Sequence, residues 1–184
     1  MNKIDISSWG KFKVGRIYKG NKWIGSGLFK IINSTPYHEK NVTETKDDDG
    51  INYVVRSKYN NGVKYKVEKN TDFKINPGNT ISFGAENRDF FYQLEEYITG
   101  NKMYYIDTSS IDEYACLFFI NVLQKTFNER YSFSDGMIPS QIYDKEIQLP
   151  VDSEGNPDWN YMSQFMKKIE KIAKDRIDLF ASVL

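Results

Sequence analysis

The chain of 184 residues carries 25 Lys and Arg against 25 Asp and Glu, so its formal net charge is zero. This balance argues against a purely electrostatic nucleic-acid binder, because such proteins are normally basic. The single cysteine, Cys116, excludes an internal disulfide, and no apolar run reaches the roughly 18 residues of a membrane span. With no secretory leader visible, the sequence predicts a cytoplasmic protein without a membrane segment.

The first hundred residues predict short strands separated by turns. Alternating or β-branched segments indicate strands at residues 11–18, 28–32, 51–56, 62–67, 72–75, 80–84, 90–93 and 103–106. Between two of them, Asn60-Asn61-Gly62 supplies the residue types that accept positive φ in a tight turn. Residues 113–127 predict one internal helix, with Tyr114, Leu117, Phe118, Val122 and Leu123 on its buried faces and Cys116 in the core.

The last segment predicts a long amphipathic helix. Asn156 is suited to the N-cap and Pro157 to the first helical position, and a helix from Asp158 to Leu184 would span about 40 Å. Apolar residues then recur at three- and four-residue steps and make one stripe: Trp159, Met162, Met166, Ile169, Ala173, Ile177, Phe180 and Leu184. We therefore expect a compact domain over residues 1–151, and a turn and docking helix over 152–184. The alternative is a stripe that packs back on its own domain.

Motifs for catalysis are weak in this sequence. His38 is the single histidine, and no Cys/His cluster or phosphate-binding loop accompanies it. Asp72 and Lys74 have the Asp-x-Lys spacing that metal nucleases use, but no convincing acidic partner precedes them. The sequence therefore predicts no catalytic residues and no metal ligands.

Four segments, spread in order over nearly the whole chain, carry a family resemblance. They are residues 9–20, residues 51–56 with 60–63, residues 77–84 with 91–93, and residues 131–133 with 147–151 and 157–159. Together they resemble the target-recognition domain of type I restriction–modification specificity subunits, in a single-domain or half-subunit form. The resemblance implies an α/β (α+β) fold, in which a compact mixed-sheet recognition domain is followed by a long C-terminal helix.

The resemblance also implies a role without catalysis. Such a subunit reads one half of a split double-stranded DNA target and presents it to a DNA methyltransferase, and sometimes to a nuclease. S-adenosylmethionine would be bound by that partner, so no cofactor is expected on this chain. In the family two long helices pack antiparallel, which implies that this helix pairs with a second copy or with another half-subunit.

Candidate DNA-contacting residues lie in polar turns and basic strands. Asn side chains can pair with the adenine edge, and Arg or Lys with guanine or phosphate. The candidates are Lys30, Arg56, Lys58, Asn60, Asn61, Lys64, Lys66, Asn87, Arg88, Tyr92 and Gln93. A plain hairpin, a connecting loop and a solvated strand face are the alternative interpretations of these segments.

Two other functions stay open at this point. The zero net charge and the acidic Asp47-Asp48-Asp49 loop are compatible with a protein-interaction module or an inhibitor that mimics a specificity subunit. Asp72 and Lys74 are compatible with a small metal-dependent nuclease.

Overall fold

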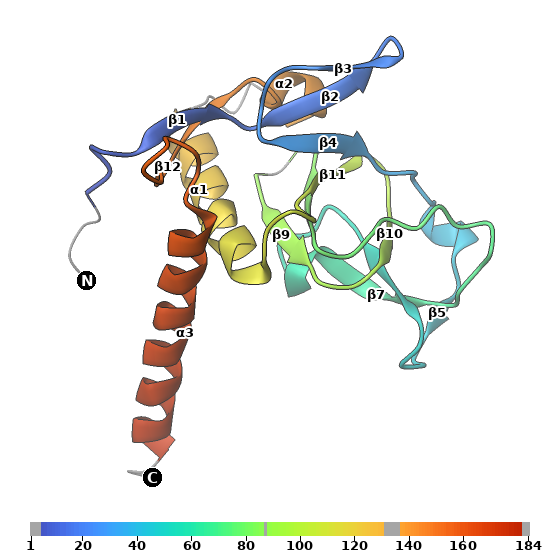
Figure 1. The fold of residues 1–184 in the computed structure, drawn as a ribbon. Coiled ribbons are helices and arrows are strands. Elements are labelled where there is room, and N and C mark those ends of the chain that lie inside the picture. Colours follow the sequence, from blue (N-terminus) through green and yellow to red (C-terminus); the bar gives the residue numbers. More distant parts are fainter. Residues whose placement is uncertain (1–4, 87, 131–136, 182–184) are drawn as a thin grey trace.

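The structure, a computed structural model, describes residues 5–86, 88–130 and 137–181. A body of strands lies against one long helix, and a second long helix leaves this body and extends away from it (Figure 1). The strands form a six-stranded, a four-stranded and a two-stranded sheet. The protein thus has the α+β fold that the sequence predicts.

The main sheet has six strands in the order β3-β2-β4-β11-β8-β9. They are β2 (Gly15–Lys19), β3 (Lys22–Ile24), β4 (Phe29–Asn33), β8 (Thr80–Gly84), β9 (Phe90–Gln93) and β11 (Met103–Asp107). Neighbours are antiparallel except β2 and β4, which run parallel. The strands predicted at residues 80–84 and 90–93 are confirmed. The strand predicted at 11–18 divides at Val14 into β1 and β2, which belong to different sheets.

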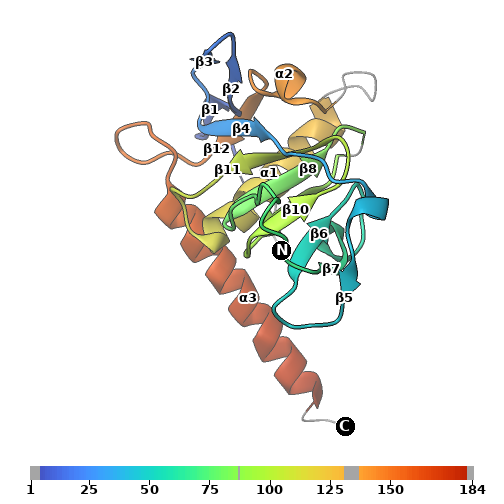
Figure 2. The same cartoon turned by 90° about the vertical axis from the view of Figure 1, so that its right-hand side faces the viewer.

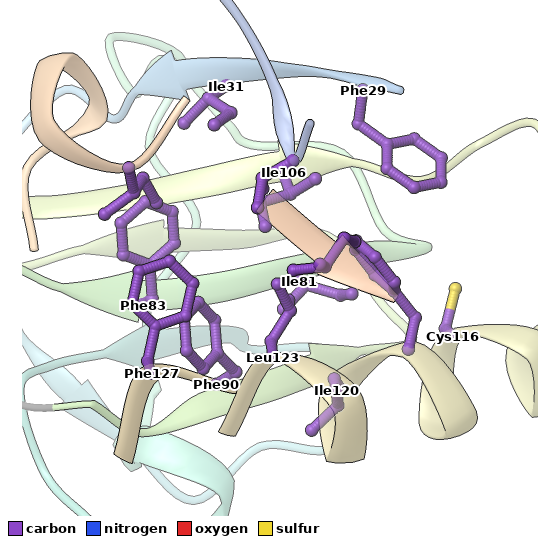
Figure 3. Packing of buried hydrophobic residues seen from close by; sticks show 14 of the residues in the cluster. Phe29, Ile31, Ile81, Phe83, Phe90, Ile106, Cys116, Ile120, Leu123 and Phe127 are labelled. Carbon is purple, nitrogen blue, oxygen red and sulfur yellow. The ribbon is translucent and has the colours of Figure 1, made fainter. Parts of the chain in front are cut away.

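The core lies between one face of the main sheet and helix α1 (Glu113–Arg130). Because side chains alternate across a strand, the register sets a row of buried isoleucines, Ile17, Ile31, Ile106 and Ile81, on adjacent strands. Aromatic side chains of the sheet and of α1 interdigitate below this row, as Figure 3 shows for Phe83, Phe90 and Phe127. Cys116 is fully buried there, as predicted.

The opposite face of the main sheet is partly covered by a small sheet of order β10-β6-β7-β5. Its strands are β5 (Glu44–Thr45), β6 (Ile51–Val54), β7 (Val63–Val67) and β10 (Tyr97–Thr99). The hydroxyls of Tyr97 and Thr80 lie 3.0 Å apart and join the two sheets. The strand predicted at residues 72–75 is wrong. Asn70 Oδ1 accepts the Asp72 N–H and the Tyr37 hydroxyl accepts the Lys74 N–H, so side chains replace ladder partners there.

Segments from both ends of the chain close the domain. Strand β1 (Gly10–Lys13) pairs antiparallel with β12 (Glu146–Leu149), which sequence patterns did not predict as a strand. A short helix, α2 (Pro139–Ile142), lies near the main sheet, and two 3-10 turns, η1 (Glu39–Asn41) and η2 (Asn60–Gly62), flank the small sheet. Among the described residues, no helix combines the length and apolar character that crossing a membrane requires.

The terminal helix α3 (Trp159–Ala181) begins two residues later than its predicted first position at Pro157. Its N-cap is Asp158, because Asp158 Oδ1 accepts the Tyr161 N–H at 2.8 Å. The predicted cap, Asn156, instead donates its N–H to Asp152 Oδ1 within the preceding turn. The 23 described residues span about 34 Å.

Helix α3 has two unlike halves. Trp159, Met162 and Met166 pack into the core of their own domain, and Met162 is fully buried. This corrects the prediction that these three residues face a partner. From Lys171 onward every described residue is exposed, and this distal half projects from the body (Figure 2). The predicted stripe is therefore intramolecular in its first turns and uncovered in its last turns.

Asp112 ties the two long helices together. Its Oδ1 accepts the Ala115 N–H at the start of α1, and its Oδ2 accepts the Ser163 hydroxyl of α3 at 2.6 Å. Lys167 Nζ lies 3.5 Å from the same carboxylate. Partial burial raises the pKa of Asp112, but these hydrogen bonds and the Lys167 charge outweigh it and hold the pKa below its usual value.

Candidate nucleic-acid interface

The Asn60–Gly62 turn is the most strongly positioned polar loop at the small sheet. Asn60, Asn61 and Gly62 have φ values of 49°, 54° and 78°, so the prediction of a turn with positive φ is confirmed. Asn60 Nδ2 donates to Val63 O at 2.9 Å, and Asn61 Nδ2 donates to Tyr92 O at 2.7 Å. An Asn amide has two N–H donors and a carbonyl acceptor, so these bonds orient both side chains without exhausting them.

Gln93 supports this turn from below. Its side chain is 3% exposed, and its Nε2 donates to Asn61 O at 2.9 Å and to Ser82 Oγ at 3.0 Å. The prediction that Gln93 touches DNA is therefore wrong, because the residue lies between the turn and strand β8. Its role in the structure is to hold the turn against the main sheet.

The cations near the turn are mostly held by acceptors. Arg56 forms an ion pair with Glu86, and Lys64 forms one with Glu39. Lys66 Nζ donates to the backbone oxygen of Asp48 at 2.6 Å. A phosphate must therefore compete with an existing partner at each of these three positions.

The pKa shifts agree with this pairing. A hydrogen bond from Lys64 lowers the pKa of Glu39, and the same bond raises the pKa of Lys64. Hydrogen bonding from Lys102, with the charge of Arg56, lowers the pKa of Glu86. Glu39, Lys64 and Glu86 therefore stay ionised near neutral pH.

Lys58 differs from these cations. Its Nζ lies 5.3 Å from the ring centroid of Tyr59, an aromatic side chain that is 71% exposed. Within the part of the chain that the structure describes, Lys58 has no carboxylate at ion-pair distance. Lys58 and Tyr59 are therefore an exposed cation and an exposed ring beside the turn.

Side chains of β9 and of the loop before it point inward where they are described. The Tyr92 hydroxyl donates to Asn79 Oδ1 at 3.0 Å, and burial raises the pKa of Tyr92 to about 12. Arg88 Nη1 donates to the backbone oxygen of Phe127. Asn87 lies outside the described residues. The structure thus gives Tyr92 and Arg88 internal partners, and their DNA contacts stay a prediction.

Lys30 is not part of the same cluster. It lies on β4, on the side of the main sheet remote from β9, and its Nζ is 5.4 Å from the ring centroid of Trp23 on β3. The β2–β3 hairpin that carries this ring was not predicted as a hairpin. The signal was present, because Gly20-Asn21 is a turn dipeptide between two short β-type runs.

Asp72 and Lys74 do not assemble a metal centre with other described residues. They lie in the turn that replaces the predicted strand, and within the described ranges no group of three His, Cys, Asp or Glu side chains could hold a metal ion. A cavity of about 290 Å³ beside Arg56 is lined in part by Tyr37, His38 and Tyr53. The single histidine is thus near the small sheet and remote from the core.

The distal half of α3 forms a second uncovered surface. Ile169 is partly buried, whereas Ala173, Ile177 and Phe180 are exposed, the last two by 65% and 73%. Leu184 lies outside the described residues. Phe180 and Ile177 lie within one turn of each other, so the surface they form is apolar and continuous.

Comparisons with known proteins agree with this fold. The family described as Type I restriction modification DNA specificity domain matches residues 26–179. A curated relative, the Type II restriction enzyme BgcI specificity subunit S.BcgI of Heyndrickxia coagulans, is 24% identical over 126 residues. That match covers 67% of this chain and 36% of the relative.

Two solved structures share the fold over nearly the whole chain. The S subunit of a type I restriction-modification system from M. genitalium has a TM-score of 0.58 at 13% identity, over 96% of this chain and 41% of that one. The HsdS subunit from Thermoanaerobacter tengcongensis has a TM-score of 0.57 at 9% identity, over 94% and 40%. The chain thus spans between 36% and 41% of the length of these relatives.

The family match covers most of the sequence, and the arrangement of sheets and terminal helix agrees with it. The resemblance carried by the four sequence segments is thereby confirmed. The chain belongs to the family of type I restriction modification DNA specificity domains.

Proposed function

We propose that this chain reads one half of a split DNA target and presents the site to a separate methyltransferase, without catalysis of its own. The family match over residues 26–179 carries the proposal. The Asn60–Gly62 turn supports it, because two amide side chains are held in fixed positions beside the exposed Lys58 and Tyr59. Amides that are oriented in this way can recognise the adenine edge in the major groove.

The proposal assigns different tasks to the residues around the turn. Asn60 and Asn61 read bases, and Lys58 neutralises a phosphate that fixes the register. Arg56 and Lys64 join the contact by exchanging Glu86 and Glu39 for phosphate oxygens. Gln93 holds the turn in a fixed position over β8 through hydrogen bonds to Asn61 and Ser82. S-adenosylmethionine belongs to the partner enzyme, and any nuclease activity belongs to a partner as well.

A selection experiment tests this function. The chain, purified together with its methyltransferase, is incubated with a duplex library of split random half-sites, and the bound fraction is sequenced. We expect one short sequence to be enriched, and Lys58→Ala to weaken binding to all duplexes with the enriched sequence unchanged. Lys125→Ala, an exposed lysine on α1, is the matched control. Binding without any sequence preference would reject the proposal.

The proposal also assigns a partner to the distal half of α3. Two copies of the chain pair through Ala173, Ile177 and Phe180 in antiparallel fashion and present two identical readers, which favours an inverted-repeat target. The exposure of Ile177 and Phe180 supports this pairing, since a soluble helix seldom leaves such side chains in water without a use.

Two substitutions of equal chemistry distinguish pairing from general disruption of the helix. Ile177 and Leu179 are both 65% exposed, but two residues rotate the side chain by about 200° around the helix. Ile177→Glu places a charge in the pairing surface, and Leu179→Glu places it on the opposite side. Light scattering should show a dimer for the unchanged chain and for Leu179→Glu, and a monomer for Ile177→Glu. Equal masses for both variants would contradict the pairing.

A further inference from the structure

The β2–β3 hairpin is an exposed element that the proposed reading of bases does not use. Gly20 and Asn21 form its two-residue turn with φ values of 58° and 61°, the geometry that matches strand twist in tight hairpins. The register sets Lys19 directly opposite Lys22 at the tip and Tyr18 opposite Trp23 one step below. Because side chains alternate along each strand, the two rings lie on one face of the hairpin, and the two lysines at its tip lie on the other face, that of Ile17 and Ile24.

The aromatic rings are open to solvent. Tyr18 is 60% and Trp23 is 40% exposed, and their ring centroids lie 5.5 Å apart. Lys30 Nζ stands 5.4 Å from the Trp23 ring. Beside them lies a groove of about 710 Å³ with Ile32 and Tyr104 in its wall. The hairpin thus presents flat apolar area together with cationic groups.

Positive charge on this hairpin is not compensated. Lys19 opposes Lys22, and Arg16 lies beside Lys30 in the parallel β2–β4 pair, although like charges on facing strand positions are destabilising. Asp107 of β11 faces Lys30 from the other side, but the two side chains are not at ion-pair distance. The sequence has no Asp or Glu between Asp5 and Glu39. Among the described residues, no carboxylate lies within ion-pair distance of Arg16, Lys19 or Lys22.

This arrangement contrasts with that of the cations at the turn. Arg56 and Lys64 have carboxylate partners within the domain, whereas the hairpin retains repelling neighbours that an anion from outside would relieve. A sugar–phosphate backbone fits this surface, because its regularly spaced phosphates can pair with the cations and its sugars can lie against the flat rings.

The hairpin and the turn address the same side of the molecule. Arg16, Tyr18 and Lys30 alternate with core residues and so point to the sheet face on which the small sheet packs. Figure 1 shows the hairpin and the small sheet extending on the side away from α1. They lie toward opposite edges of the six-stranded sheet. Five strand spacings give about 24 Å, close to seven base pairs of duplex.

We propose that the β2–β3 hairpin and the adjoining β4 form a second, sequence-independent contact, in which Arg16 and Lys30 hold the phosphate backbone of the duplex that the Asn60–Gly62 turn reads. The inference rests on the proposed DNA-reading function. Tyr18 and Trp23, on the same face as these two cations, lie against the sugars. The hairpin fixes the orientation of the duplex about seven base pairs from the turn, and it contributes affinity without sequence preference.

The test measures salt dependence. Fluorescence anisotropy of a labelled 30-base-pair duplex of mixed sequence is followed at several salt concentrations for the chain in complex with its methyltransferase. Each phosphate contact contributes about 0.9 to the slope of log K against log salt. The double variant Arg16→Ala/Lys30→Ala should therefore lower the slope by about 1.8 and the affinity by about 60-fold at 0.1 M salt. The variant should fold normally, because it removes a repelling pair.

Two controls make the outcome specific. Lys125→Ala/Lys168→Ala removes two exposed lysines from the helices that cover the other side of the main sheet, and it should leave the slope unchanged. The half-site selected by the library should be the same for the hairpin variant and the unchanged chain. Trp23→Phe should also remove any change in tryptophan fluorescence on adding duplex.

Other outcomes overturn the inference. An unchanged slope in the hairpin variant, with sequence selection intact, rejects the hairpin contact and leaves the proposed function standing. An unchanged slope with loss of methyltransferase co-purification means that the hairpin binds an acidic protein surface instead. No duplex binding by the unchanged complex at low salt rejects the proposed function and the hairpin contact with it.

Discussion

Replacing Gln93 by Leu should loosen the Asn60–Gly62 turn without removing any group that faces solvent. Gln93 is almost fully buried and donates from Nε2 to Asn61 O and Ser82 Oγ. Leucine has a similar volume but no donor, so both acceptors lose a partner. At about 0.5–1.5 kcal/mol for each hydrogen bond, the expected loss is about 2 kcal/mol. For a domain of this size it lowers Tm by about 4–8 °C.

The assay combines thermal unfolding with DNA selection. Gln164→Leu is the matched control, because Gln164 is exposed on α3 and its replacement leaves no buried acceptor. We expect the control to unfold like the unchanged protein. In Gln93→Leu, discrimination between the selected half-site and random duplex should fall, because the turn is no longer fixed over β8. A Gln93→Leu protein with unchanged Tm would refute the positioning role.

A charged variant sharpens the same test. Gln93→Glu keeps the side-chain shape but points a carboxylate at Asn61 O, which is an acceptor. Burial and this contact favour the protonated acid, so its pKa is raised above the unfolded value. A group with a raised folded pKa contributes stability at low pH that is lost as pH rises through that pKa. Gln93→Glu should therefore be less stable than Gln93→Leu at pH 7 and recover near pH 4, and urea unfolding at both pH values would show it.

Three further predictions concern the turn, the helices and the charge balance. Gly62→Ala should lower the free energy of unfolding in urea by about 1–2 kcal/mol, because φ is positive at this position. The loss should exceed that of Gly20→Ala. A new Cβ meets Phe91 and Val54 at 3.3 Å at position 62, but nothing within 4 Å at position 20. Asp112→Ala should remove about 1 kcal/mol of N-cap stabilisation at pH 7. Because the pKa of the Asp112 carboxyl is depressed, the carboxylate stabilises the fold above pH 3.8, its usual pKa, and this stabilisation is lost as the pH falls below that value. The stabilities of Asp112→Ala and of the unchanged protein should therefore converge in acid-unfolding curves. Glu86→Gln should free Arg56 from its ion pair. The slope of log K against log salt should then steepen by about 0.9, and duplex binding should tighten up to about eightfold at 0.1 M salt. Glu154→Gln, in the loop before α3, should change neither the slope nor the affinity.

Local chemistry made some of the fold predictable. The Asn60-Asn61-Gly62 turn follows from residue types that accept positive φ, and β8 and β9 follow from short β-type runs bounded by Gly and polar residues. The N-cap of α3 did not follow. Asn156 and Asp158 are equally good capping types, and the choice is made by Asp152, which takes the Asn156 N–H for the preceding turn.

Burial by distant segments explains the other differences. Phe90-Phe91-Tyr92-Gln93 has no polar and apolar alternation, so the sequence does not show that Gln93 lies under the turn of another strand pair. The stripe of α3 is equally apolar at Met162 and at Phe180. Periodicity alone cannot tell where a helix leaves its own domain, because that point depends on where α1 ends and on which of its side chains can pack against α3.

The division of charge between paired and unpaired cations has a functional consequence. Non-specific DNA binding comes almost entirely from phosphate neutralisation, so we expect little of it from the turn of a chain with zero net charge whose turn cations are held by Glu39 and Glu86. In the proposed function, contact at the turn exchanges the carboxylates of Glu86 and Glu39 for phosphate oxygens at Arg56 and Lys64. The outcome depends on whether Asn60 and Asn61 meet the right bases. In the proposed contact, the unpaired cations at the hairpin supply the attraction that the turn lacks, so affinity and discrimination are carried by elements of two different sheets.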